Sequence, residues 1–136
     1  MSKIKVIPCS GIGKVYGLMA REAALSVTER LCPEITETVC LALLVTGTNE
    51  AKEKVREQCC ITIDGCPLMC AEKSVKAAGG NIKQQYRSVD EMLYHKGTIP
   101  GTGTALTDDG WQIVDELADK IAKRAEEILA EVSYND

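Results

Sequence analysis

The sequence predicts an α/β fold in a single domain: a small, mainly parallel sheet flanked by helices, with a long C-terminal amphipathic helix. Short β-branched runs alternate with segments of helical periodicity, as in βαβ proteins. The strongest apolar pattern with a 3.6-residue period lies in residues 108–136. A length of 136 residues suits one domain, which we place at residues 1–136. A domain of this size buries enough surface to fold without a metal or disulfides.

The first β-loop-α unit is predicted in residues 3–31. Lys3–Pro8 alternates charged and β-branched residues and stops at a proline, which is typical of a strand that leaves a sheet. Residues 9–13 then form a tight loop. From Lys14 onward an apolar residue recurs at every fourth position, which predicts an amphipathic helix that ends before Cys32. The recurring residues are Val15, Met19, Ala23, Val27 and Leu31.

The middle of the chain is less regular and contains the next strand. The apolar run of residues 38–47 fits either a buried strand or a short buried helix, and both remain open. Residues 49–58 place acids early and bases late, as the helix dipole prefers, so we expect an exposed helix. Residues 59–63 predict a buried strand that ends at the turn Asp64-Gly65.

Another helix, another strand and a connection precede the last helix. Pro67 is expected in the first turn of a helix that ends at Gly79-Gly80. Alternation in residues 81–88 predicts a half-exposed strand at a sheet edge. A Gly- and Thr-rich connection or lid then leads to the final helix, with Thr107 or Asp108 as its cap.

Charge and hydropathy exclude several classes of partner. The 16 Lys and Arg against 20 Asp and Glu give a formal charge of −4, so no basic field attracts nucleic acid or an anionic membrane. The longest apolar run, Val39–Val45, is too short to span a bilayer. The first residues lack an export pattern, and we expect a cytoplasmic protein. Residues 108–136 hold nine acids against three bases, and their apolar face is expected to close the fold or to form a homodimer.

Seven cysteines are the most unusual feature of the composition. Their density is below that of secreted disulfide scaffolds, and their number is odd. In a reducing compartment such a count points to metal binding or thiol chemistry. Because His95 is the only histidine, sulfur must be the main ligand of any bound metal. We expect His95 itself to face solvent.

Four of the cysteines are candidates for a common site. Cys66 precedes Pro67, so its sulfur is expected at a helix N-cap, where backbone N–H groups and the helix dipole favour a thiolate. Cys70 lies four residues on, about one turn up the same face. Cys9 follows the first strand in an equivalent way, and the loops after parallel strands open on one edge of the sheet. Cys40 is the best fourth ligand, and four thiolates suit tetrahedral zinc.

Other residues near these positions have a structural as well as a functional interpretation. We expect Cys32, Cys59 and Cys60 to be buried core residues, because free cysteine is often buried. Asp64 is expected mainly to cap its turn, and its second interpretation is a hydrogen-bond acceptor or proton carrier beside the metal. Lys14 either offsets part of the negative charge of a zinc with four thiolates or is a surface lysine.

Three short motifs carry a resemblance to a known family. Ile63-Asp-Gly-Cys-Pro-Leu-Met-Cys70, Pro8-Cys-Ser-Gly11 and Val39-Cys-Leu-Ala42 resemble the DGC domain family, named for its Asp-Gly-Cys motif, over roughly residues 3–80. Members are described as zinc-binding because of four potential chelating cysteines. The resemblance implies a zinc ligand set here and supplies no substrate; the ligands would be Cys9, Cys40, Cys66 and Cys70.

Other functions remain open. Thiol redox chemistry would use Cys66 as a low-pKa nucleophile and Cys70 or Cys9 as the resolving thiol. Four thiolates also suit an iron–sulfur cluster, which would colour the protein brown. The glycines of residues 11–17 are weak evidence for a dinucleotide loop. A phosphate loop with Cys9 as nucleophile lacks the arginine of cysteine phosphatases, because Val15 occupies that position.

The sequence contains no recognisable acid–base pair or nucleophile triad, so it supports no assignment of catalysis. Because a core of this size should fold without zinc, we expect the site to serve metal handling, sensing or thiol chemistry rather than to staple the fold.

Overall fold

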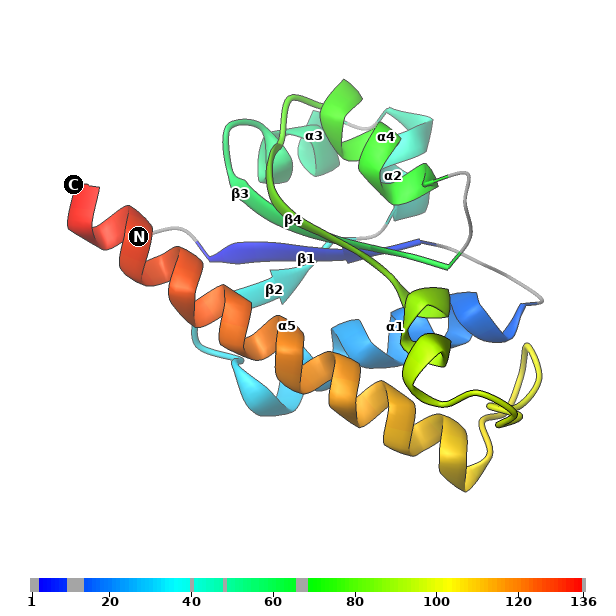
Figure 1. Cartoon of the computed structure of the whole chain (residues 1–136). Helices are drawn as coiled ribbons and strands as arrows, with labels where there is room; N and C mark the ends of the chain where they lie inside the picture. Colours follow the sequence, from blue (N-terminus) through cyan, green and yellow to red (C-terminus); the bar gives the residue numbers. More distant parts are fainter. Residues whose placement is uncertain (1–2, 10–13, 40, 48, 66–68, 136) are drawn as a thin grey trace.

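The computed structural model describes residues 3–9, 14–39, 41–47, 49–65 and 69–135. They form an α/β structure with a four-stranded sheet and a long helix, α5, which confirms the predicted fold class (Figure 1). The elements are, in chain order, β1 (Ile4–Pro8), α1 (Val15–Leu25), the π-helical segment η1 (Ser26–Leu31), β2 (Thr36–Thr38), α2 (Leu41–Thr46), α3 (Asn49–Val55), β3 (Cys59–Asp64), α4 (Cys70–Ala77), β4 (Asn81–Arg87), the 3-10 helix η2 (Ser88–Tyr94) and α5 (Asp108–Asn135).

The strand pairings of the sheet are all parallel, and the strand order is β2-β1-β3-β4. β1 is central: its Val6 pairs with Thr38 of β2 on one side and with Ile61 of β3 on the other. β4 is an edge strand whose residues alternate between exposed and half-buried, as predicted. Because the strands run in the same direction, their carboxyl ends meet at one edge of the sheet.

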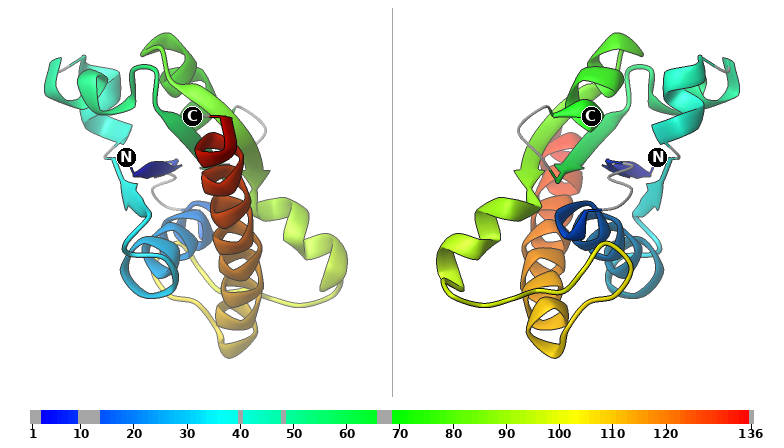
Figure 2. Two further views of the ribbon diagram at one scale, coloured as in Figure 1. Left: turned by 90° about the vertical axis from the view of Figure 1, so that its left-hand side faces the viewer. Right: turned by 90° about the vertical axis from the view of Figure 1, so that its right-hand side faces the viewer.

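Helices cover both faces of the sheet. α1 and α5 pack on one face, and α2, α3 and α4 lie on the other (Figure 1, Figure 2). Burial on both faces explains why β1 and β3 are apolar almost throughout. Among the described residues, the largest fully buried side chains come from the sheet and from the α1–α5 layer: Ile7, Met19, Ile61, Ile63, Ile113, Leu117, Ile121 and Ile128.

α5 closes the α1 side of the sheet, as the sequence predicts. Its buried residues recur every three or four positions, and each large one stabilises the fold by about 1.5–3 kcal/mol. Thr107 is its N-cap, because the Thr107 Oγ1 accepts the Gly110 N–H at 3.0 Å. Pairing of this helix with a second copy stays a prediction. Among the described residues, no helix is both long and apolar enough to cross a membrane.

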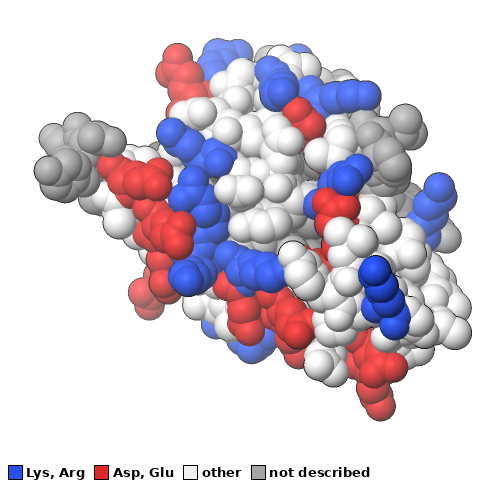
Figure 3. Space-filling model, in the orientation of Figure 1, with Lys and Arg blue, Asp and Glu red and all other residues white. Residues whose placement is uncertain are grey.

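The outer surface of α5 is less uniformly acidic than its composition suggests. Arg124 bonds to Glu127 at 3.3 Å and to Glu131 at 3.2 Å, and its Nε donates to Gln84 of β4 at 3.2 Å. Acidic and basic side chains accordingly lie next to each other over this part of the surface (Figure 3). These contacts also join the helix to the edge strand.

In two segments the structure settles or changes the secondary structure that the sequence predicts. The apolar run of residues 38–47, which fits a strand or a helix, is mainly helical: only its first residue, Thr38, belongs to β2, and α2 follows. The predicted first helix extends to Leu31, but its last six residues are π-helical. Within that segment the Thr28 Oγ1 donates to the Ala24 carbonyl at 3.0 Å and thereby competes with the α-helical backbone bond.

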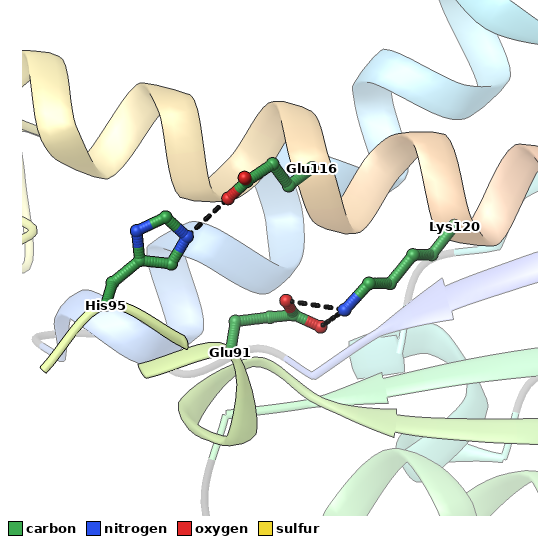
Figure 4. A network of polar contacts seen from close by, with 4 residues as sticks. All are labelled: Glu91, His95, Glu116 and Lys120. Atoms are coloured by element: carbon green, nitrogen blue, oxygen red, sulfur yellow. Dashed lines mark hydrogen bonds and ion pairs between the residues drawn. The ribbon is translucent and has the colours of Figure 1, made fainter. Parts of the chain in front are cut away.

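η2 folds back onto α5 through two polar contacts (Figure 4). Glu91 pairs with Lys120, and the His95 Nε2 pairs with a carboxylate oxygen of Glu116. The expectation that His95 faces solvent is therefore wrong. The reason is tertiary: the chain turns after η2 and brings this half-buried ring beside a helix 21 residues further on.

Candidate functional site

The carboxyl edge of the sheet brings several described elements together. Cys9 follows β1 directly, Gly65 follows β3, and Ser88 follows β4. β2 ends at Thr38 beside β1. The parallel topology thus opens these loops on one edge, as the sequence predicts.

Cys9 is fixed at this edge by its backbone and by its sulfur. Its N–H donates to the Ile63 carbonyl at 2.8 Å, and its Sγ accepts a hydrogen bond from the Gly65 N–H at 3.1 Å. The side chain is buried, with 6% of the residue exposed. A backbone N–H donated to sulfur favours the thiolate over the thiol.

Asp64 ends β3 and is completely buried. Its carboxylate accepts the Ala71 N–H at 2.7 Å and the Glu72 N–H at 3.3 Å, so it caps the first turn of α4. Burial raises the pKa of Asp64, and the two backbone N–H groups act in the opposite direction. The expected capping role is correct, but the donors belong to α4, seven and eight residues away, rather than to the turn.

Gly65 is the point of closest approach between β3 and α1. A Cβ atom at this position would lie 2.7 Å from the Gly17 nitrogen and 2.8 Å from the Tyr16 carbonyl carbon, so no side chain fits. The first turn of α1 therefore packs directly on this backbone. The same turn is held from the β4 side, because the Ser88 Oγ donates to the Tyr16 carbonyl at 2.6 Å.

Cys70 is the first residue of α4 and is exposed. The preceding Met69 has a left-handed backbone with φ 54°, so α4 begins at Cys70. α4 therefore begins three residues after the predicted start at Pro67. The physical reason is that the buried Asp64 carboxylate, not a cysteine at the N-cap, receives N–H groups of the first turn. Cys66 and Pro67 lie outside the described residues, and the spacing of Cys66 and Cys70 on one face stays a prediction.

Two of the four predicted ligands, Cys40 and Cys66, lie outside the described residues. Two neighbours of the first, Val39 and Leu41, are buried where the chain passes from β2 to α2. Within the part of the chain that the structure describes, no group of three or more His, Cys, Asp or Glu side chains is placed to hold a metal ion. The complete four-cysteine set therefore stays a prediction.

The other three cysteines are near the amino ends of β2 and β3, away from this edge. Cys32 and Cys60 are buried, and Cys59 is half-buried. Burial raises the pKa of Cys60 to about 12. Burial and the nearby Glu126 raise the pKa of Cys32. Both buried thiols stay protonated at neutral pH, which confirms their predicted core role.

Two residues at the carboxyl edge of the sheet are not identified by the sequence analysis. Ser88 and Tyr16 are joined by a hydrogen bond across 72 positions of the chain, which no local pattern reveals. The available indication is topological: Ser88 follows a predicted strand, and the residue after a parallel strand lies at the carboxyl edge.

Comparisons with curated proteins and with solved structures find no match for the chain. A family model does match: the DGC domain model aligns with residues 5–108. The aligned range contains the buried Cys9, the Asp64-Gly65 turn and Cys70, and it covers more than half of the 136 residues. The chain therefore belongs to the DGC domain family.

Proposed function

We propose that the protein binds zinc through four thiolates at the carboxyl edge of the sheet, those of Cys9, Cys40, Cys66 and Cys70. The observation that carries this proposal is the hydrogen bond from the Gly65 N–H to the Cys9 Sγ. It joins the cysteine after β1 to the residue next to Cys66, although its two partners are 56 positions apart. Membership of the family supports the same set, because the match spans all four cysteines.

The chemistry of the donors favours zinc over a hard cation. Thiolates select zinc, copper(I) or iron–sulfur clusters, whereas magnesium and calcium prefer oxygen. The Gly65 N–H donates to the Cys9 Sγ, and Cys70 is the first residue of α4. Bound zinc would hold the four sulfurs in a tetrahedral arrangement. The contribution of the chain would be to bring these sulfurs together.

We further infer that zinc is not needed to build the fold. Val6, Ile61 and Ile121 belong to a buried core between the two helical layers, and Cys9 is the one proposed ligand among the core residues that the structure describes. A site added to a complete core is available for metal handling, for sensing or for presenting a zinc-bound thiolate.

Elemental analysis of protein purified without oxygen tests the zinc proposal. We expect one zinc per chain in the wild type and a large loss of zinc in Cys9→Ser and Cys70→Ser, because each variant removes one thiolate. The matched control is Cys59→Ser, which changes a half-buried cysteine at the other end of β3 and should leave the zinc content unchanged. Full zinc occupancy in Cys9→Ser, or equal loss in Cys59→Ser, contradicts the proposed ligand set.

The same preparation distinguishes the other thiolate functions. If the purified protein is brown and contains iron and sulfide, the site holds an iron–sulfur cluster rather than zinc. Metal-free protein with fewer free thiols than the sequence contains would instead indicate disulfide chemistry.

A further inference from the structure

We propose that Asp64 is a positioning residue of the cysteine site: its carboxylate sets where Cys70 lies relative to Cys9. The inference rests on the proposed function for the identity of the ligands. The contacts that carry it belong to the chain alone.

The first step concerns the start of α4. Met69, the residue before the helix, makes no side-chain capping bond, and its left-handed backbone sets the start of the helix at Cys70. The carboxylate of Asp64 takes over the capping by accepting N–H groups from the first turn. The nearer donor, Ala71, directly follows Cys70 in the chain, so the helix start is tied to the end of β3.

The second step concerns the other sulfur. Gly65 is the next residue after Asp64, and its N–H holds the Cys9 Sγ at 3.1 Å. The Asp64-Gly65 dipeptide thus contacts both ligand segments: its backbone holds the Cys9 sulfur, and its carboxylate holds the N–H of Ala71, the residue after Cys70. Both contacts are buried, where water does not compete for the hydrogen bonds.

The third step concerns what holds the dipeptide itself. Asp64 is part of β3 and pairs in register with Arg87 of β4, while the backbone of Gly65 lies against the first turn of α1. The reference point for the two sulfurs is therefore a rigid part of the sheet. Ligands held on rigid elements before the metal arrives lose little freedom when they bind it.

Loss of a purely structural helix cap and loss of a positioning residue have different effects on zinc binding. A structural cap stabilises α4, so its loss should act on zinc binding only as far as it destabilises the helix. A positioning residue acts on Cys70 beyond any loss of stability. Val75 provides the matched control, because it is fully buried in α4 and its truncation weakens helix packing without touching the cap.

The experiment compares Asp64→Ala, Asp64→Asn and Val75→Ala in the full chain. Zinc affinity is measured by competition with a chromophoric chelator, and unfolding by urea is measured on the same samples. We expect Asp64→Ala to raise the zinc Kd by about 10–100-fold, the range seen when groups that orient metal ligands are removed. Asp64→Asn should recover part of the affinity, because its amide oxygen still accepts one N–H. Val75→Ala should change the Kd less than about threefold even where it destabilises the protein as much.

Amide hydrogen exchange on the metal-free protein gives a second measurement that does not depend on zinc. Asp64→Ala should lose protection at residues 70–73, whereas Val75→Ala should lose it evenly along α4. Equal Kd values for the wild type and Asp64→Ala, or equal effects of Asp64→Ala and Val75→Ala at equal stability, overturn the inference. If the wild type binds no zinc, the proposed function fails by itself, and unchanged exchange at residues 70–73 then also rejects the role of Asp64.

Discussion

The ammonium group of Lys120 lies between the two carboxylate oxygens of Glu91, at 3.0 and 2.9 Å (Figure 4). The side chain of Glu91 is 8% exposed, whereas that of Lys120 is 47% exposed. The same ammonium lies 4.6 Å from the centre of the Tyr94 ring. One surface lysine on α5 therefore neutralises a nearly buried acid of η2 and covers an aromatic ring beside it.

Removal of this lysine should cost more than removal of an exposed neighbour. Lys120→Met leaves the Glu91 carboxylate buried without its cation, and we expect the free energy of unfolding to fall by about 1–3 kcal/mol. Lys123→Met, on an exposed position of the same helix, should change it by less than about 0.5 kcal/mol. Urea denaturation measures the free energy of unfolding of both variants. Equal losses would show that the ion pair between Glu91 and Lys120 does not stabilise the fold.

Two glycine substitutions should differ because their surroundings differ. Gly65→Ala would drive a methyl group into the backbone of Tyr16 and Gly17, and we expect a loss of about 3 kcal/mol or more. Gly97→Ala meets no atom within 4 Å, and its φ of +81° costs only about 1–2 kcal/mol. The order of the two melting temperatures is the test. A larger effect at Gly97 would contradict the close packing of α1 on β3.

The buried Cys60 should make the free energy of unfolding fall at alkaline pH. Its pKa is raised by burial to about 12, so the folded chain keeps a proton that the unfolded chain releases near pH 9. The contribution of this group is complete below about pH 9 and is lost as the pH rises from there towards 12. We expect Cys60→Ala to flatten the fall in unfolding free energy above pH 9 by up to about 1.4 kcal/mol per pH unit. An unchanged slope would refute this assignment.

Glu57 has a left-handed backbone, with φ 61°, just beyond the end of α3. Its side chain is exposed, and its N–H donates to the Gly79 carbonyl at 2.9 Å. Glu57→Gly should raise the free energy of unfolding by about 1 kcal/mol, because glycine adopts this conformation without steric cost. Glu53→Gly, inside α3, should lower it by a similar amount, about 1 kcal/mol. A loss of stability in both variants would exclude backbone strain as the cause.

Zinc removal should leave the domain folded. With a strong chelator we expect far-ultraviolet circular dichroism to stay native-like, because most residues of the buried core are not proposed ligands. The melting temperature should fall, since a ligand that binds only the folded state stabilises it. Complete unfolding on chelation would show that the metal is structural, as in a zinc finger.

Local patterns predict most of the fold because they coincide with its tertiary contacts. The β-branched strand ending at Pro8, the apolar strand ending at Asp64 and the 3.6-residue period of α5 each match a face that the structure buries. The common carboxyl edge then follows from parallel βαβ connections, whereas the strand order and the short strand β2 are not predicted.

The rest of the site depends on contacts that no short window of sequence contains. Cys66-Pro67 has a local helix-start pattern, but the Asp64 carboxylate seven residues before Ala71 determines where α4 begins. Asp64-Gly65 predicts a turn without revealing that the α1 backbone lies on the glycine. His95 is misjudged for the same reason, because its partner belongs to another element.

The place of α5 in the chain has a consequence for synthesis. This helix follows every strand of the sheet, so a growing chain can pair β1 with β3, and β3 with β4, before the cover of one sheet face is complete. During that interval the apolar surface that later receives Ile113, Ile121 and Ile128 is open to other unfinished chains. The protein is therefore most prone to aggregation, and most dependent on chaperones, between completion of β4 and release of α5.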